Sequence, residues 1–340
     1  MTDGNRQWLL ASRPEGTPTM ENFELVETAV PEPAPGEVVV RTLYLSVDPY
    51  MRGRMRDAES YAEPWNVGEP MQAGVVGEVV EANTPDYEPG TLVTGQLEWA
   101  DYSTASPSEL REVDPDVAPI TTALGVLGLT GLTAYFGLLE VGEPNPGDTV
   151  VVSGAAGAVG SVVGQIAKLD GCRVVGTAGS DAKTEFLTEE LGFDAAINYK
   201  TTEDIRATLA EATPNGVDVY FDNVGGEITD AVFDRLNVDA RVAVCGQIAL
   251  YNLEERPTGP RKLGTLIQKR AKVEGLLVSD FATRWSEAGQ RLGRWVAEGK
   301  LTNRETVTDG LENAPGAFLG LFEGENVGKQ LVKVAERTAE

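Results

Sequence analysis

The sequence predicts an α/β protein in two parts, a β-rich first part and a second part built on a doubly wound parallel sheet. Two observations support this division. Over about the first 130 residues, short runs of β-branched and aromatic residues are separated by Pro and Gly, which is typical of a β domain. From residue 149, short apolar runs alternate with helical stretches, which indicates parallel strands joined by helices. The length of 340 residues also suits two domains of ~100 to 200 residues each.

In the first part, strands are expected at residues 37–46, 73–81 and 91–95. The first strand follows a turn-forming Pro-Ala-Pro-Gly run at 33–36, and a Tyr-Glu-Pro-Gly turn at 87–90 separates the other two. A compact β-barrel-like domain fits this pattern best.

In the second part, a strand at 149–153 leads through a glycine-rich turn into a helix over 159–169. A second helix is expected over 181–191, because Asp181 begins it and Gly192 follows its end. The remaining strands are expected at 173–177, 195–198, 217–222, 241–245 and 273–278. The tail adds a helix over 314–322 and a strand over 329–334, and it is too short to form a domain.

The composition excludes several kinds of site. The chain has no histidine, which removes Ser-His-Asp and Cys-His triads, H-E-x-x-H zinc helices and His-ligated iron. Its two cysteines, Cys172 and Cys245, cannot form a disulfide framework or a Cys-rich zinc cage, so a reducing compartment is expected. With no run near ~20 apolar residues and no apolar signal core at the start, the expectation is a soluble, cytoplasmic protein away from membranes.

The charge balance is strongly acidic. The 28 basic and 53 acidic residues give a formal net charge of −25 and a pI of about 4.4. Nucleic acid is therefore not an expected partner, because phosphate binding needs a basic surface. The excess acid has two interpretations, a generic acidic protein or a surface adapted to high salt. We favour the second, because carboxylates at this density repel one another unless salt screens them.

The glycine-rich turn has the sequence G-A-A-G-A-V-G over residues 154–160, between a predicted strand and a predicted helix. Small residues in this position allow the backbone to approach a pyrophosphate, whose charge interacts with amides at the start of the helix. A plain strand-to-helix turn is the alternative. The further β-α units that follow favour a dinucleotide site.

The end of the next predicted strand distinguishes NAD from NADP. An NAD site usually has an acidic residue there, which binds the ribose 2′-hydroxyl. Here the strand ends in Thr-Ala-Gly-Ser at 177–180, so Gly179 and Ser180 leave space, and Lys183 supplies positive charge for a 2′-phosphate. A solvated surface lysine is the alternative. The predicted cofactor is NADP(H).

Two loops fall at the carboxyl ends of later strands, where ligands bind in open α/β sheets. They are residues 222–226, which contain Asn223, and residues 246–252. Turn chemistry alone can also explain residues of this type, so both interpretations stay open.

Five motifs together resemble one protein family. They are V-D-P-Y-M-R at 47–52, G-L-T-A-Y-F at 131–136, the glycine turn at 154–160, F-D-N-V-G-G at 221–226 and E-N-V-G-K-Q at 325–330. The chain resembles the zinc-independent medium-chain dehydrogenases/reductases, in the branch of leukotriene B4 12-hydroxydehydrogenase, prostaglandin reductase and curcumin reductase. The resemblance spans essentially the whole chain.

This resemblance implies an organisation and a set of partners. It implies a GroES-like substrate and catalytic domain made of residues 1–130 with 301–340, and an NADP-binding Rossmann domain over 131–300. It implies NADPH as reductant, a small-molecule enone or enal as substrate, and a homodimer. It implies no metal, since the zinc-dependent relatives use Cys, His and Glu ligands.

The resemblance also implies site residues. Tyr50 and Tyr251 are expected to face the substrate pocket as catalytic residues. The expected cofactor-binding residues are Gly157, Ala158, Val159, Gly160, Gly179, Ser180, Lys183, Tyr199, Asn223, Cys245, Gly246, Gln247, Tyr251, Leu276, Leu277, Val278 and Asn326. The family often has a serine where this chain has Ala249, so any role for that hydroxyl is in doubt.

The implied reaction is reduction of the carbon-carbon double bond of an α,β-unsaturated ketone or aldehyde. Hydride adds to the β-carbon, and the enolate charge that develops needs hydrogen-bond donors placed in advance, such as the Tyr251 and Tyr50 hydroxyls or a cofactor hydroxyl. The α-carbon then takes a proton from water or a tyrosine. The alternatives are a quinone reductase with the same hydride donor and an NADPH-binding protein without catalysis.

Overall fold

The computed structural model describes residues 4–255 and 257–338. They divide into two compact units. The first unit contains the residues up to Leu124, Glu305–Asn326 and the residues from Gln330 on. The second unit contains Gly125–Arg304 and Val327–Lys329. No helix in the described part of the chain is long and apolar enough to cross a membrane.

The second unit is built on a parallel sheet with the strand order β10-β9-β8-β11-β12-β13. Its strands are β8 (Thr149–Val152), β9 (Arg173–Ala178), β10 (Ala195–Asn198), β11 (Val217–Asp222), β12 (Leu236–Val244) and β13 (Lys272–Gly275). Counted from β8 along the chain, this is the 3-2-1-4-5-6 order of dinucleotide-binding folds, in which the ligand binds where the order reverses, between β8 and β11.

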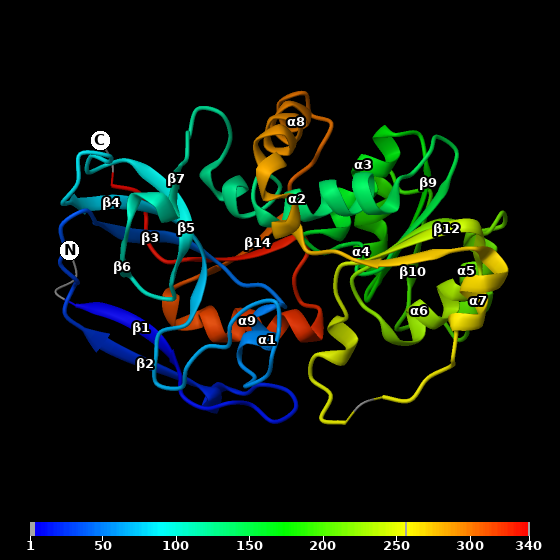
Figure 1. The fold of residues 1–340 in the computed structure, drawn as a ribbon, viewed down its shortest axis with the longest axis horizontal. Coiled ribbons are helices and arrows are strands. Elements are labelled where there is room, and N and C mark those ends of the chain that lie inside the picture. Colours follow the sequence, from blue (N-terminus) through cyan, green and yellow to red (C-terminus); the bar gives the residue numbers. More distant parts are fainter. Residues whose placement is uncertain (1–3, 256, 339–340) are drawn as a thin grey trace. The chain divides into compact units, whose positions relative to one another are not determined.

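Helices cover both faces of this sheet, as Figure 1 shows with α2 and α3 on one side and α5 and α6 on the other. The helices are α2 (Leu129–Phe136), α3 (Gly160–Leu169), α4 (Asp181–Glu185), α5 (Ile205–Ala212), α6 (Gly226–Phe233), α7 (Leu263–Lys269) and α8 (Trp285–Ala297). π-helical turns continue α2 over Gly137–Gly142 and α4 over Phe186–Glu190, and 3-10 turns lie at Ile248–Leu250 and Val278–Arg284.

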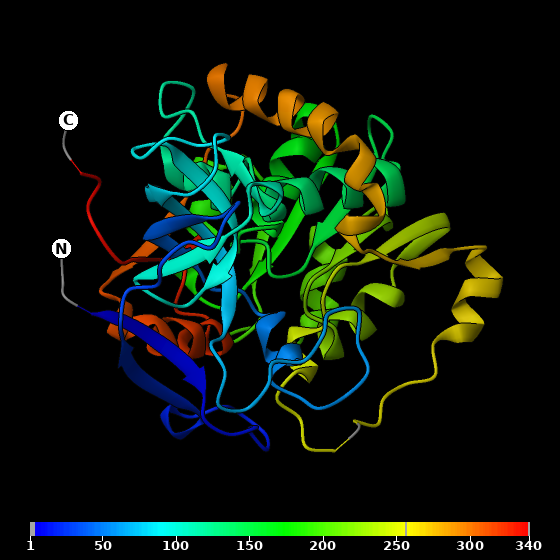
Figure 2. The ribbon, with the colours of Figure 1, turned by 60° about the vertical axis from the view of Figure 1, so that its left-hand side comes forward.

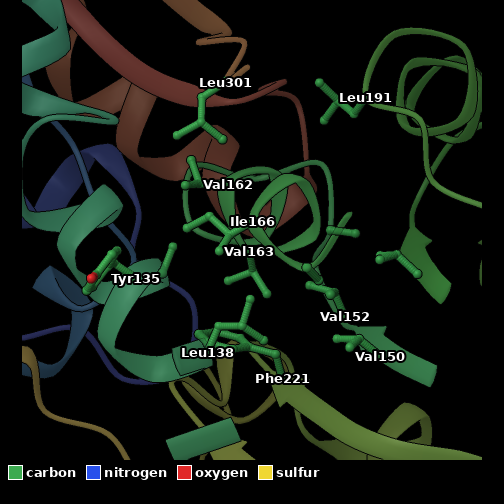
Figure 3. Close-up of a cluster of buried hydrophobic side chains, with 14 of the residues drawn as sticks. Tyr135, Leu138, Val150, Val152, Val162, Val163, Ile166, Leu191, Phe221 and Leu301 are labelled. Atoms are coloured by element: carbon green, nitrogen blue, oxygen red, sulfur yellow. The ribbon is translucent and has the colours of Figure 1, made fainter. Parts of the chain in front are cut away.

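Successive side chains of each strand point to opposite faces of the sheet, so the apolar core forms two layers. Val150 and Val152 pack with α3 in one buried cluster, which Figure 3 shows, whereas Val151 packs with α5 and α6 in another. The same alternation separates Tyr220 from its neighbour Phe221. The interior strands are therefore mostly apolar on both faces, as the apolar runs in the sequence indicate.

The first unit is mainly antiparallel. Its larger sheet has the order β14-β15-β3-β4-β5-β7, with β6 paired to β3. The strands are β3 (Val38–Ser46), β4 (Gln72–Ala82), β5 (Leu92–Glu98), β6 (Tyr102–Ala105), β7 (Leu110–Glu112), β14 (Glu305–Asp309) and β15 (Lys329–Lys333). A separate antiparallel pair, β1 (Asn5–Leu10) with β2 (Phe23–Thr28), is drawn in dark blue in Figure 2.

Short helices complete the first unit. They are α1 (Met51–Arg54), α9 (Ala314–Glu323) and 3-10 turns at Met20–Asn22, Pro107–Glu109, Ile120–Leu124 and Leu311–Asn313. Phe318 of α9 packs its ring against Phe23 and Trp99, so the tail helix shares the core of the N-terminal strands. The C-terminal segment thus belongs to this unit through packing.

The predicted fold class is confirmed, and several predicted boundaries differ in detail. The predicted domain boundary at residue 130 falls inside α2, whose buried residues pack in the core of the second unit. The helix predicted over 181–191 is α-helical only to Glu185 and continues as a π-helical turn. The strand predicted over 273–278 ends at Gly275, and residue 278 already begins a 3-10 turn.

Candidate active site

The glycine turn between β8 and α3 is held by its own backbone. The Gly157 amide donates to the Gly154 carbonyl at 3.0 Å, and Gly154 has a φ of +58°, which suits glycine. A Cβ at Gly160 would lie 2.5 Å from the Gly154 oxygen and 2.8 Å from the Ala155 Cα. The first turn of α3 can therefore approach the loop this closely only because residue 160 has no side chain.

A second glycine contact lies at the end of β9. A Cβ at Gly179 would lie 2.9 Å from the Tyr199 hydroxyl and 3.2 Å from the Lys200 Cε. The Ser180 hydroxyl accepts a hydrogen bond from the Lys183 amide, which anchors that lysine beside the same strand end. Burial lowers the pKa of Lys183, and the charge of nearby Lys200 lowers it further. The ammonium groups of Lys183 and Lys200 and the phenol of Tyr199 thus lie together at the end of β9, in a protein with a large excess of acidic residues.

The ends of β8 and β11, where the strand order reverses, are joined by hydrogen bonds. The Asn223 amide donates to the Ser153 hydroxyl at 2.9 Å, and the Asn223 side chain donates to the Ser153 carbonyl at 2.7 Å. The Ser153 hydroxyl donates to the buried carboxylate of Asp222 at 2.9 Å. The loop at 222–226 is therefore fixed against the end of β8.

The loop after β12 is attached to the same point. The amides of Cys245 and Gly246 donate to the Asp222 carbonyl at 2.8 and 3.0 Å. The amide of Gln247 donates to the Tyr251 hydroxyl oxygen at 3.3 Å. Burial raises the pKa of Tyr251, so its phenol keeps its proton at neutral pH. Burial also raises the pKa of Cys245, to about 12, which leaves an unreactive thiol.

Residues 276–278 continue the same sheet edge beyond β13. The Leu276 amide donates to the Val244 carbonyl at 2.9 Å, and the Trp285 indole donates to the Val278 carbonyl at 3.1 Å. Of the predicted cofactor residues, those of the turn, the β9 end and the loops after β11, β12 and β13 therefore lie at the carboxyl edge of one sheet. Asn326 belongs to the first unit, and its role stays a prediction.

Tyr50 also lies in the first unit, directly before α1. Burial and the nearby charge of Asp48 raise the pKa of its phenol well above the ordinary value. The Gly53 amide donates to the Tyr50 carbonyl at 2.9 Å, so a short helical turn holds its backbone. Its catalytic role stays a prediction.

The second unit fits a dinucleotide with a 2′-phosphate. The backbone at residues 154–160 is packed as closely as a pyrophosphate loop requires, and the missing Cβ of Gly179 leaves the space into which Tyr199 and Lys200 extend. Positive charge at this strand end suits a phosphate and takes the place of the carboxylate of an NAD site. This fit depends on residues of the second unit alone.

Sequence reasoning missed two of these groups. Lys200 follows Tyr199 directly, but no spacing rule connects it with Lys183, and the fold brings both to the end of β9. In the sequence, Asp222 is only the first residue of the loop at 222–226, whereas in the structure it accepts hydrogen bonds from side chains of three other segments. An acidic residue at the end of an apolar strand is the signal that could have indicated it.

Comparisons with known proteins agree with this geometry. Residues 6–113 match a family model described as the N-terminal domain of oxidoreductase, and residues 158–294 match one described as zinc-binding dehydrogenase. A putative NADP-dependent oxidoreductase, YfmJ, from Bacillus subtilis is 54% identical over 99% of both chains. The NADPH-dependent curcumin reductase of Escherichia coli is 47% identical over 97% of both chains. This chain belongs to the medium-chain dehydrogenase/reductase family.

A solved relative extends the match to three dimensions. The structure of CurA from Vibrio vulnificus in complex with NADPH has a TM-score of 0.93 and 45% identity, over 97% of this chain and 99% of that one. The predicted family and branch are confirmed, and the chain is an oxidoreductase. Although one family model has zinc in its description, no group of three or more His, Cys, Asp or Glu side chains in the described residues could hold a metal ion.

Proposed function

We propose that this NADP-dependent oxidoreductase reduces the carbon-carbon double bond of α,β-unsaturated ketones and aldehydes. The observation that carries the proposal is the Tyr251 phenol, which accepts a hydrogen bond from a backbone amide beside the loops at the carboxyl ends of β11 and β12, near the point where the strand order reverses. The relatives support it, since one of them is a curcumin reductase that depends on NADPH.

NADPH supplies the hydride when it is bound. The pyrophosphate would be held by the backbone of the glycine turn, at Gly157, Ala158, Val159 and Gly160. The 2′-phosphate would be surrounded by Gly179, Ser180, Lys183 and Tyr199. The ribose and nicotinamide would be lined by the loops after β11, β12 and β13 and by Asn326. These loops contain Asn223, Cys245, Gly246, Gln247 and residues 276–278. Lys200 would add a second positive charge at the 2′-phosphate.

Tyr251 would stabilise the charge that develops on the substrate. Hydride addition to the β-carbon moves an electron pair onto the carbonyl oxygen, and a phenol proton aimed at this oxygen stabilises the enolate. The Gln247 amide donates to the oxygen of that phenol, so the phenol proton is directed to another acceptor. The enolate then takes a proton at its α-carbon from water or a tyrosine, with Tyr50 as second candidate donor.

The predicted homodimer has structural support in the second unit. All four residues of the edge strand β13 are exposed. Leu263 and Ile267 of α7 are 76% and 82% exposed, and Figure 2 shows this helix at the periphery of the unit. Exposed apolar residues beside an open strand edge favour association with a second copy. Sedimentation should give a dimer mass, and a monomer at micromolar concentration would contradict it.

The reaction is tested by NADPH oxidation across a panel of alkenals, enones and benzoquinones, run at low and at molar salt. Saturated products from the enones, identified by mass spectrometry, are expected. Quinone reduction with no enone reduction would support the quinone reductase alternative. Tight NADPH binding with no oxidation by any compound would support the non-catalytic alternative. The predicted cytoplasmic location is tested separately, by cell fractionation.

A further inference from the structure

A buried carboxylate connects the loops of the candidate site. Asp222 is fully buried at the end of β11, and its two oxygens accept hydrogen bonds from six donors within the described residues. The donors to Oδ1 are Ser153 Oγ at 2.9 Å, Tyr220 Oη at 2.9 Å, and the Val224 and Gly225 amides at 3.0 and 2.9 Å. The donors to Oδ2 are Thr229 Oγ1 and Gln247 Nε2, both at 2.8 Å.

These donors come from four places in the fold: the end of β8, β11 with the loop that follows it, α6, and the loop after β12. All are hydrogen-bond donors toward Asp222, which matches the acceptor-only chemistry of a carboxylate. Hydrogen bonds to an ionised group are shorter and stronger than those between neutral groups. The carboxylate therefore fixes several segments against one another.

Among the six donors, Gln247 is the residue whose own backbone amide contacts the Tyr251 hydroxyl. The side chain of Gln247 donates to Asp222 Oδ2, and the backbone amide of the same residue donates to the Tyr251 hydroxyl. Gln247 also packs against Gly225, where a Cβ would lie 2.3 Å from its Oε1. Gly225 has a φ of +76°, a backbone conformation that glycine adopts with less strain than any other residue. The amide side chain is thus held on two sides, and it fixes the backbone that contacts the phenol.

We propose that Asp222 is a positioning residue for the reduction, acting through the Gln247 side chain to orient the Tyr251 hydroxyl. The inference rests on the proposed function of Tyr251. The negative charge of Asp222 also helps to raise the pKa of the Tyr251 phenol, which keeps that phenol a proton donor. Asp222 does not contact the substrate in this scheme.

The decisive variant is Gln247→Met, which keeps the length of the side chain and removes its amide. Thr229→Val is the matched control, because it removes a donor to the same Asp222 oxygen without touching the Tyr251 loop. We expect Gln247→Met to lower kcat about tenfold, with a smaller change in NADPH affinity, as one lost hydrogen bond implies. Thr229→Val should retain the wild-type kcat even where its melting temperature falls.

A second measurement does not depend on catalysis. In protein labelled with 13C at the tyrosine ζ-carbon, the Tyr251 signal is assigned by its loss in Tyr251→Phe. The chemical shift of this Tyr251 signal should change in Gln247→Met and stay the same in Thr229→Val. In Asp222→Asn, the NH2 group of the new side chain is a donor that would face donors in place of a carboxylate oxygen. This variant can fail to fold, so it serves only as a supporting variant.

Two results would overturn the inference: an unchanged kcat and Tyr251 signal in Gln247→Met, or equal losses of kcat in both variants. If the wild-type protein reduces no enone, the proposed function fails, and the Tyr251 signal still decides whether Gln247 orients the phenol.

Discussion

A single hydroxyl determines the chemistry proposed here. In Tyr251→Phe the donor to the enolate is lost while the aromatic ring remains, so kcat should fall ~10²- to 10³-fold. The NADPH dissociation constant should change little, because the pyrophosphate and 2′-phosphate contacts lie elsewhere in the site. Tyr135→Phe is the control, since Tyr135 is a buried tyrosine of the same unit whose hydroxyl accepts from Arg291. Unchanged turnover in Tyr251→Phe would remove Tyr251 from the mechanism.

The lysines at the end of β9 give a prediction about cofactor choice. Lys183→Met and Lys200→Met should each weaken NADPH binding about 10- to 100-fold and leave NADH binding unchanged, because only NADPH has the 2′-phosphate. Fluorescence titration measures both constants. Lys168→Met is the control, since Lys168 pairs with Asp194 elsewhere in the second unit. Equal losses for NADPH and NADH would contradict a 2′-phosphate role.

The same lysines predict a pH dependence. Burial and the Lys200 charge lower the pKa of Lys183 below its ordinary value of about 10.4, so its positive charge is lost at a lower pH than in a solvated lysine. NADPH affinity should therefore weaken as pH rises through the alkaline range below 10.4, while NADH affinity stays constant. In Lys200→Met the like charge is gone, so this loss should move to higher pH. Titrations at a series of pH values measure both effects.

At the scale of elements, the turn from β8 to α3 depends on the absence of a side chain. In Gly160→Ala the new Cβ meets backbone atoms at 2.5 and 2.8 Å, so the turn must open. We expect a destabilisation of ~1–3 kcal/mol together with a clear loss of NADPH affinity. Gly164→Ala is the control in the same helix, because the atoms nearest its Cβ would belong to the Phe193 ring and not to the backbone of the turn. Thermal melts and NADPH titrations separate the two effects, and equal NADPH affinity in both variants would contradict the role of the turn.

Elements with a strong local signal were predicted from the sequence. The strands β8, β10 and β11 have almost the predicted bounds. β8 and β11 are almost entirely buried and mostly apolar, whereas the edge strand β10 is only partly buried and is marked by its short apolar run. The pair β1–β2 was not predicted, because its strands carry polar residues and are joined by a long connection without a tight turn signal. Its position depends on partners distant in sequence, such as Trp99, whose carbonyl accepts from the Trp8 amide.

At the scale of the whole molecule, the net charge of −25 should make stability depend on salt. Screening shortens the Debye length from ~10 Å at 0.1 M to ~3 Å at 1 M, which weakens the repulsion among carboxylates. The melting temperature should therefore rise between ~0.1 M and ~3 M KCl. A flat response would contradict salt adaptation. NADPH affinity should fall over the same range, since salt also screens the attraction of Lys183 and Lys200 for phosphate.

The sequence by itself determined the fold class, the cofactor and the branch of the family. The fold class and the cofactor depend on local patterns, which are apolar runs, glycines at set spacings and a strand end without an acidic residue, and the branch follows from the resemblance of five motifs. Only the tertiary structure decided that Lys200 approaches Lys183, and that Asp222 connects four segments and reaches Tyr251 through Gln247. These contacts join residues whose proximity is set by the order of strands in a parallel sheet, and no local pattern encodes that order.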